Sequence, residues 1–210
     1  MAAPCAPLHC VREPVRNGGS VRPLNSIVRQ QLKAPESIRT SRLNLRRSTD
    51  SDLTAIFEYA SDPEVTAYLV WKRVTEPDQV RDYLAKCQAN WTAGSEHTWF
   101  LAENINDRVI GAVACRIRGS EADVGFVLNR RFWNLGYMTE AASAVVAWLM
   151  SLPIIERVRA TCDVENSRSV RVLEKLGLTR HGIVPGGMVR PNISGEPRDS
   201  YVYAKQRTAV

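Results

Sequence analysis

The sequence predicts an α/β (α+β) domain in which helices flank a mixed, mostly antiparallel sheet. Three strand-like runs, His97–Glu103, 108–118 and Glu121–Leu128, follow one another with short polar turns between them, as in an antiparallel meander. The third run leads through a loop into a helical pattern and then into a fourth alternating run at 157–164. Because a strand, loop, helix, strand unit is a parallel crossover, the fourth strand should lie beside Glu121–Leu128.

Shorter patterns predict the elements before the meander. Residues 42–46 alternate between apolar and polar side chains, like a half-buried strand. Thr49 and Asp52 have the spacing of a helix cap, so a helix should follow them. A second helix should begin at 75–78.

Composition limits the class of protein. With 210 residues, 44% of them hydrophobic, the chain suits one domain plus an extension. No apolar run approaches the roughly 18 residues that span a bilayer, and no secretory segment opens the chain, so we expect a cytoplasmic protein without a membrane contact. Five scattered cysteines without a Cys-x-x-Cys pair, and three isolated histidines, predict reduced thiols and no metal site.

The basic charge is concentrated near the N-terminus. Residues 1–48 hold nine Lys/Arg and two Asp/Glu, a net charge of +7, whereas the remainder carries −1. We expect a flexible basic extension at 1–38, with at most a short helix at 24–32, followed by the folded domain at 39–210. The extension is either a leader without function or an arm that contacts nucleic acid or the ribosome, or a transit peptide.

The loop at 130–136 carries the clearest functional signal. It joins Glu121–Leu128 to a helix, and it contains Arg131, Asn134 and Gly136. Free backbone N–H groups and the positive end of the helix dipole would meet there, which favours a phosphate. Neither the Gly-x-Gly-x-x-Gly fingerprint nor the Gly-Lys-Ser/Thr of a P-loop occurs, so those two nucleotide sites are excluded. An ordinary strand-to-helix connection is the alternative.

This loop resembles that of a known family. The pattern Arg131-x-x-Asn134-x-Gly136, followed by Tyr137 and Thr139, is similar to the pyrophosphate loop of GNAT-superfamily N-acetyltransferases. Asn134 stands where that family usually has its first glycine.

A second segment extends the resemblance. By itself Asn166 suits the cap of a helix and needs no further role. However, Asn166-x-x-Ser169-(x)4-Glu-Lys-Leu-Gly is similar to the second cofactor segment of the RimJ/RimL-like branch, which acetylates protein N-termini. Residues 41–46 and 199–205 resemble that branch's first and last strands, so the likeness covers about 39–206.

The resemblance implies a GNAT fold, whose sheet splays between the strands Glu121–Leu128 and 157–164 and receives acetyl-CoA as a wedge. The pyrophosphate would rest on the amides of 131–136 and the helix start, with no metal required. The pantetheine amides would pair with the backbone of 126–128. The implied cofactor-binding residues are Phe126, Val127, Leu128, Arg131, Asn134, Leu135, Gly136, Tyr137, Met138, Thr139 and Asn166.

The resemblance also implies direct acetyl transfer to a primary amine. The expected acceptor is a protein N-terminus, and the alternative is a small amine, amino acid or antibiotic. A backbone N–H near Val127 would stabilise the developing oxyanion. A carboxylate is the natural base for the amine, and Asp123, Glu121 and Glu103 are candidates, although each suits a solvated strand charge equally well.

The leaving thiolate needs a proton, and the resemblance implies its donor. Many family members use a tyrosine at the position that Leu173 occupies here, so that route is absent. Ser169 matches the serine of the RimJ/RimL-like branch and is the predicted donor. Some members have a glutamate before the final strand, where this chain has Met188 or a neighbour.

The acceptor side follows no motif. In the resembled family the region that corresponds to 65–73 helps to wall the acceptor site, so Tyr68 and Trp71 are candidate substrate-binding residues, with core packing as the alternative. The second acceptor-facing loop is expected at 183–198. The chain should be a monomer or a homodimer. A different class remains open, namely a non-catalytic CoA-binding module or an RNA- or ribosome-associated protein.

Overall fold

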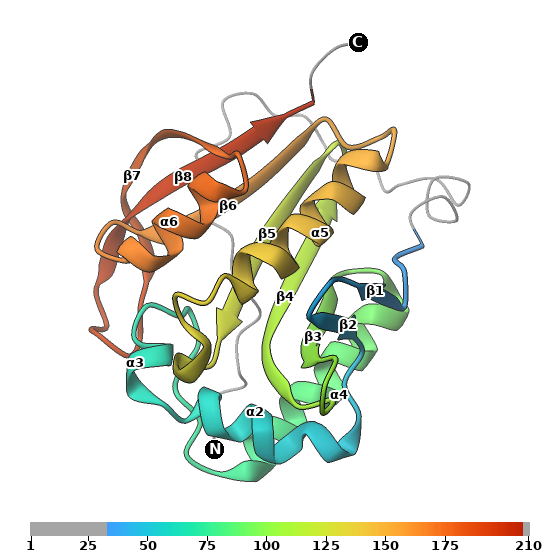
Figure 1. Cartoon of the computed structure of the whole chain (residues 1–210). Coiled ribbons are helices and arrows are strands. Elements are labelled where there is room, and N and C mark those ends of the chain that lie inside the picture. Colours follow the sequence, from blue (N-terminus) through green and yellow to red (C-terminus); the bar gives the residue numbers. More distant parts are fainter. Residues whose placement is uncertain (1–32, 208–210) are drawn as a thin grey trace.

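Eight strands in the order β1-β2-β3-β4-β5-β6-β8-β7 form one sheet in the computed structural model, which describes residues 33–207 (Figure 1). Within it β5 and β6 pair in parallel and the other neighbours pair antiparallel. The strands are β1 (Ser37–Arg39), β2 (Leu43–Arg46), β3 (His97–Glu103), β4 (Val109–Arg118), β5 (Glu121–Leu128), β6 (Arg157–Asp163), β7 (Thr179–Val189) and β8 (Pro197–Gln206). The meander and the parallel crossover predicted from the sequence are confirmed.

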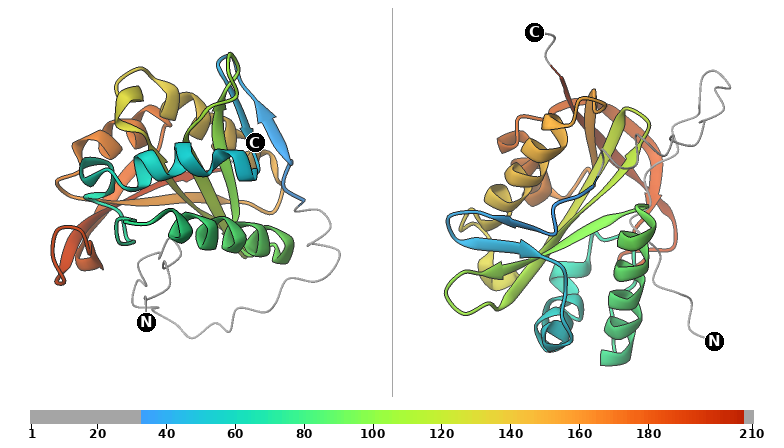
Figure 2. Two further views of the ribbon diagram at one scale, coloured as in Figure 1. Left: turned by 90° about the horizontal axis from the view of Figure 1, so that it is seen from below. Right: turned by 90° about the vertical axis from the view of Figure 1, so that its right-hand side faces the viewer.

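Helices cover both faces of the sheet (Figure 2). Successive side chains of β3 point to opposite faces and therefore pack in two different hydrophobic clusters. Trp99 and Leu101 pack in the cluster that contains α5 and α6, whereas Phe100 and Ala102 pack in the cluster that contains α2 and α4. The helices are α2 (Leu53–Ala60), α3 (Pro63–Thr66), α4 (Pro77–Ala93), α5 (Tyr137–Ser151) and α6 (Ser167–Lys175), with the 3-10 turns η1 (Asp50–Asp52) and η2 (Arg130–Phe132).

The sheet splits between its two parallel strands. β5 and β6 pair only over Glu121–Asp123 and Arg157–Arg159. Beyond Asp123, β5 continues beside β4 as far as Leu128, while β6 continues beside β8 as far as Asp163. Arg157 and Arg159 each place an Nη1 atom 3.2 Å from the Glu121 carboxylate, which joins the two strands at the closed end. From Val124 to Leu128, therefore, one edge of β5 has no strand partner.

Two parts of the sheet depart from the predictions. Residues 183–189 were expected in a loop, but they belong to β7 at the sheet edge, where glycines and a proline interrupt any alternation that sequence reading could detect. β1 was not predicted, and the expected boundary of the extension at residue 38 falls inside it. Just before β1, Ala34 is buried and the Trp99 indole donates a hydrogen bond to the Pro35 carbonyl. The possible helix at 24–32 lies outside the described residues.

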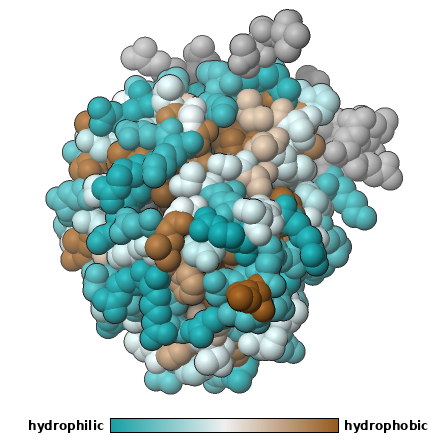
Figure 3. Space-filling model, viewed as in Figure 1, coloured by the Kyte–Doolittle hydropathy of each residue, from teal (hydrophilic) through white to brown (hydrophobic). Residues whose placement is uncertain are grey.

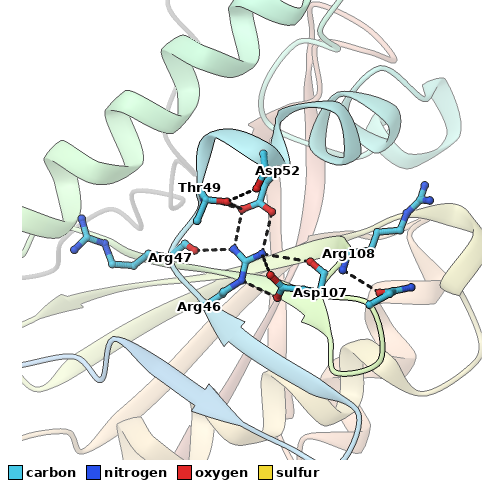
Figure 4. Close-up of polar contacts among 8 residues, drawn as sticks. Arg46, Arg47, Thr49, Asp52, Asp107 and Arg108 are labelled. Carbon is cyan, nitrogen blue, oxygen red and sulfur yellow. Dashed lines mark hydrogen bonds and ion pairs between the residues drawn. The ribbon is translucent and has the colours of Figure 1, made fainter.

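An arginine cluster joins β2 to the start of α2 and to the β3–β4 turn (Figure 4). The Arg46 guanidinium donates to Asp52 at 2.7 and 2.9 Å and to Asp107 at 3.1 Å. The Asp52 carboxylate also accepts the backbone N–H of Thr49, so the predicted cap of this helix is confirmed. Hydrogen bonding to Asp52 outweighs burial and raises the pKa of Arg46.

The remaining features concern membranes, thiols and metals. Among residues 33–207, no helix is long and apolar enough to cross a membrane. Hydrophilic residues predominate on the face shown in Figure 3, and apolar residues interrupt them singly or in small groups. Cys87, Cys115 and Cys162 are buried, and none of the three is part of a disulfide within the described residues. The described part of the chain gathers no three His, Cys, Asp or Glu residues into a metal-binding group.

Candidate functional site

The start of α5 leaves a row of backbone N–H groups open. The preceding turn satisfies its own amides, since the N–H groups of Phe132 and Trp133 donate within η2. Asn134 and Gly136 then adopt positive φ angles of 62° and 81°, which turn the chain into the helix. Within the described residues, the amides of 134–139 donate no hydrogen bond, and the first helical bond runs from Glu140 to Gly136. Such a row is an anion-binding arrangement.

The predicted phosphate loop is thus shorter than expected. The Arg131 amide donates to the Asn129 side chain and is not open, whereas the Arg131 guanidinium is 73% exposed and contacts Glu58 at 3.3 Å. Leu135 is 56% exposed as a whole residue, and the Tyr137 ring lies beneath the Arg42 guanidinium, 4.1 Å away. Only the main chain of Leu135 and Tyr137 remains available to an anion.

A cavity adjoins these amides, here called the loop cavity. Its walls come from three elements: Phe126, Val127 and Leu128 of β5, residues 134–139 at the start of α5, and one face of α6. The α6 face contributes the cations Arg168, Arg171 and Lys175, and no carboxylate of the described residues pairs with them. Sequence reading missed these cations, although their spacing of three and four residues puts them on one helical face.

Contacts with β5, α6 and the β1–β2 turn fix the loop. The Trp133 indole donates to the Leu128 carbonyl at 2.9 Å, and the Arg168 guanidinium lies 4.3 Å above the same ring. At the other end, the Glu140 carboxylate accepts hydrogen bonds from Thr40, Ser41 and Arg42. Burial alone would raise the pKa of Glu140, but these hydrogen bonds lower it to about 2. The helix start is therefore held in place from the β1–β2 side.

A second cavity, here called the central cavity, occupies the split between β5 and β6. Asp123, Phe126 and Thr161 line it, as do Asn166 and Ser169 at the start of α6. The predicted cap is confirmed, because the Asn166 Oδ1 atom accepts the Ser169 N–H at 3.1 Å. Asn166 and Ser169 also line the loop cavity. The two predicted segments, far apart in sequence, thus meet at one site.

The candidate bases fall in different places. Asp123 is in the central cavity, its side chain is 19% exposed, and its buried Oδ1 atom has no hydrogen-bond partner. Glu121 pairs with two arginines at the closed end of the split. Glu103 lines none of the cavities described here, and its carboxylate accepts a hydrogen bond from Tyr137 instead. The structure adds Glu96, a buried carboxylate in the central cavity that sequence reading missed.

A third cavity, here called the helix cavity, lies between α2, α4 and the sheet. Trp71 lines it, whereas Tyr68 lines the central and loop cavities, so the two predicted substrate residues are near different cavities. The three cavities share Leu69 and Phe126 in their walls. Asn192 ties the acceptor-side segments together, because its amide donates to the carbonyls of Thr66 and Trp71 at 2.8 Å and accepts the N–H of Arg73.

Known proteins are similar to this chain in sequence and in fold. The profile of the family described as acetyltransferase (GNAT) domain matches residues 42–179. The uncharacterized N-acetyltransferase YnaD of Bacillus subtilis is 32% identical over 170 residues, which cover 80% of this chain and 95% of that protein. A GNAT-family acetyltransferase structure from Bacillus anthracis is 28% identical, with a TM-score of 0.71, and the match covers 81% of this chain and 98% of that one. The ribosomal-protein alpha-N-acetyltransferase RimL, solved with coenzyme A, has a TM-score of 0.72 at 20% identity, covers 81% and 98%, and shares the fold.

Proposed function

This chain belongs to the GNAT acetyltransferase family, and we propose that it transfers the acetyl group of acetyl-CoA to a primary amine, foremost a protein N-terminal amine. A small amine, amino acid or antibiotic is the alternative acceptor. The observation that carries the proposal is the split beyond Asp123, where an open edge of β5 leads to the open amides of 134–139.

The residues around the loop cavity fit acetyl-CoA. The amides of 134–139 would hold its pyrophosphate, and the cations Arg168, Arg171 and Lys175 on α6 add charge of the right sign for its phosphates. The unpaired edge of β5 between Val124 and Leu128 offers main-chain groups to the pantetheine arm. The free Nδ2 of Asn166 would bind the same arm, since its Oδ1 is used as a cap.

When bound, acetyl-CoA supplies an acetyl group that is activated as a thioester. We assign to Asp123 the removal of the proton that the attacking amine must lose, because its unpartnered Oδ1 belongs to the central cavity. We assign to Ser169 the donation of a proton on the sulfur side, because Ser169 lines both the central and the loop cavities. Glu103 has no part in this proposal, since it lines neither of them.

The finer assignments follow from the motifs. The Asn166 and Ser169 segment supports the RimJ/RimL-like branch and, with it, a protein N-terminus as acceptor. We propose that the domain predicted at 39–210 is the catalytic domain of a monomer or homodimer, and that the extension predicted at 1–38 ends before Ala34, because residues 34–39 contact the domain and pair with β2. Cys87, Cys115 and Cys162 form no disulfide within the described residues, which supports a reducing compartment that we take to be the cytoplasm.

A thiol-release assay with acetyl-CoA tests the proposal across N-terminal peptides, polyamines and amino acids. We expect release that depends on an amine, and a large loss in Asp123→Asn and Ser169→Ala. If CoA protects the protein against heating but no amine stimulates release, the chain is a CoA-binding module and catalysis is refuted. If CoA does not protect it, the cofactor site itself is refuted.

A further inference from the structure

Arg190 brings a buried positive charge into the central cavity. It follows the end of β7, its side chain is 4% exposed, and it belongs to the cavity lining together with Tyr68 and Met188. A buried guanidinium loses its hydration and therefore needs partners for its N–H groups. No motif marked this residue, because it follows the edge strand β7, which β8 separates from β6 and the split.

The protein gives this guanidinium few good partners. Its Nε atom is 3.9 Å from the Asp163 carboxylate and forms no hydrogen bond. Its Nη1 and Nη2 atoms reach only the Met188 sulfur at 3.3 Å and the Ser200 hydroxyl at 3.4 Å. Sulfur is a weak acceptor, and the second contact is long. Burial accordingly lowers the pKa of Arg190 more than Asp163 raises it.

Asp163 does not accept the remaining N–H groups of Arg190. Both of its oxygens accept hydrogen bonds from Arg198, at 2.7 and 3.3 Å, and one also accepts the N–H of Glu165. Arg198 is part of β8 and lies outside the central cavity. Its ion pair with Asp163 therefore joins the neighbouring strands β6 and β8. The cation at Arg190 therefore has donor capacity that no carboxylate within the described residues takes up.

A complementary anion lies in the same cavity. Asp123 has a buried Oδ1 atom without a hydrogen-bond partner, and its nearest cation, Arg118, is 3.9 Å away. The other two charged residues of the cavity, Glu96 and Arg116, form an ion pair at 2.5 Å, although the Glu96 Oε2 and Arg116 Nη2 atoms have no hydrogen-bond partner. Of the four charged residues of the cavity, only Arg190 and Asp123 therefore have no opposite charge closer than 3.9 Å.

We propose, on the basis of the function proposed above, that Arg190 binds a carboxylate of the acceptor, so that the acceptor carries an anionic group near the amine it presents to Asp123. The carboxylate takes the N–H groups that Asp163 leaves open, in a charge-assisted pair. A neutral acceptor would leave those donors buried and unpaired, and a polyamine would add a second cation beside Arg190. The preferred acceptor is therefore an amine of the amino-acid type. The carboxylate is either its own α-carboxylate or the side chain of an acidic first residue of a peptide.

Matched acceptor pairs test this proposal. The first pair is alanine and alaninamide, which differ at the α-carboxylate. The second pair is a short amidated peptide that begins with aspartate and one that begins with asparagine. We expect the wild type to favour the anionic member of at least one pair by about 10- to 100-fold in kcat/KM, the range of one hydrogen bond to a charged group. The pair that shows the preference identifies the source of the carboxylate.

Variants connect the preference to Arg190. Arg190→Met should reduce the ratio within that pair to about 1, mainly through KM for the anionic acceptor, while CoA still protects the protein against heating. Arg190→Lys should retain part of the preference. Arg180→Met, which removes an exposed charge outside the cavities from β7, the strand that Arg190 follows, should keep the wild-type ratio. Because each ratio compares two acceptors of one sample, a partly unfolded variant does not distort it.

The results distinguish a failure of the Arg190 proposal from a failure of the proposed acetyltransferase function. Equal use of the anionic and neutral members by the wild type, or a preference that Arg190→Met keeps, would overturn the role of Arg190 and leave the acetyltransferase proposal intact. A wild type that acetylates no amine at all would overturn both. If Arg190→Met does not fold, the wild-type ratios and Arg190→Lys still decide.

Discussion

Two arginines with little exposure, Arg46 and Arg190, are both close to aspartates, and yet they are used in opposite ways. Arg46 donates to four carboxylate oxygens of Asp52 and Asp107, and its pKa is raised because the hydrogen bond to Asp52 outweighs burial. Arg190 has no hydrogen bond to Asp163, and its pKa is lowered because burial dominates. A guanidinium saturated by the protein holds elements together, whereas one left open in a cavity can bind a ligand.

The same contrast separates two helix starts. At α3 the Asp62 carboxylate accepts the N–H groups of Glu64 and Val65, so the protein itself satisfies the helix end. At α5 the residue before the helix is Gly136, which has no side chain, and the amides of 134–139 stay open. The side of the molecule around Arg46 is thus closed by its own contacts, while the split between β5 and β6 is not.

The largest effect on stability should come from the closed side. Arg46→Met leaves the Asp52 carboxylate, which is largely buried, without its cation, and we expect it to lower the free energy of unfolding by about 3–5 kcal/mol. Urea denaturation measures this change. Arg81→Met is the control, because Arg81 pairs on the surface with Asp78 and should contribute under about 1 kcal/mol. Equal losses in the two variants would contradict the distinction.

Asp123→Asn should lower the catalytic rate and leave the stability of the protein nearly unchanged. We expect kcat to fall by about 100- to 1000-fold, because the proton acceptor is lost, with CoA affinity and the melting temperature nearly unchanged. Steady-state kinetics with the best amine measures the loss. Glu103→Gln is the matched control, since Glu103 lies outside the cavities and its neutralisation should leave kcat within a few-fold of wild type. A larger loss of kcat in Glu103→Gln than in Asp123→Asn would identify Glu103, at the end of β3, as the general base.

Glu140→Gln tests the hydrogen bonds from the β1–β2 turn that hold the start of α5. Replacing the carboxylate should cost about 1–2 kcal/mol at pH 7, where it is ionised and hydrogen-bonded to Thr40 and Arg42. Because folding lowers the pKa of Glu140 to about 2, its contribution is complete above the unfolded pKa of about 4.3 and disappears as the pH falls toward 2. Melting curves of the two proteins should converge over that interval. A constant difference would mean that the charge is irrelevant.

The smallest effect should come from one cation of α6. Arg171→Gln removes an unpaired charge from the loop cavity and should weaken CoA binding by about 3- to 5-fold, with less effect at high salt. Pantetheine lacks the adenosine diphosphate part, so its binding should not change. Calorimetric titration of both ligands measures the difference. Arg180→Gln, outside the cavities, should leave both affinities at their wild-type values.

Local pattern and chain order were enough to predict much of this molecule. The cap at Thr49 and Asp52, the cap at Asn166 and the parallel pairing of β6 depend on residues close in sequence or on a general rule of chain connection. β7 escaped prediction because an exposed edge strand that contains glycines and a proline shows no alternation. Glu96 and Arg190 escaped it because only the folded sheet brings them to the split.

The most direct test of the open site follows individual backbone amides. In two-dimensional amide spectra of the isotope-labelled protein titrated with CoA, the signals of 134–139 should shift strongly as their N–H groups acquire an acceptor. The signals of Arg46 and Asp107, on the closed side, should stay where they are. Stationary signals at 134–139, or the largest shifts around Arg46, would contradict the claim that this chain binds CoA through open main-chain amides.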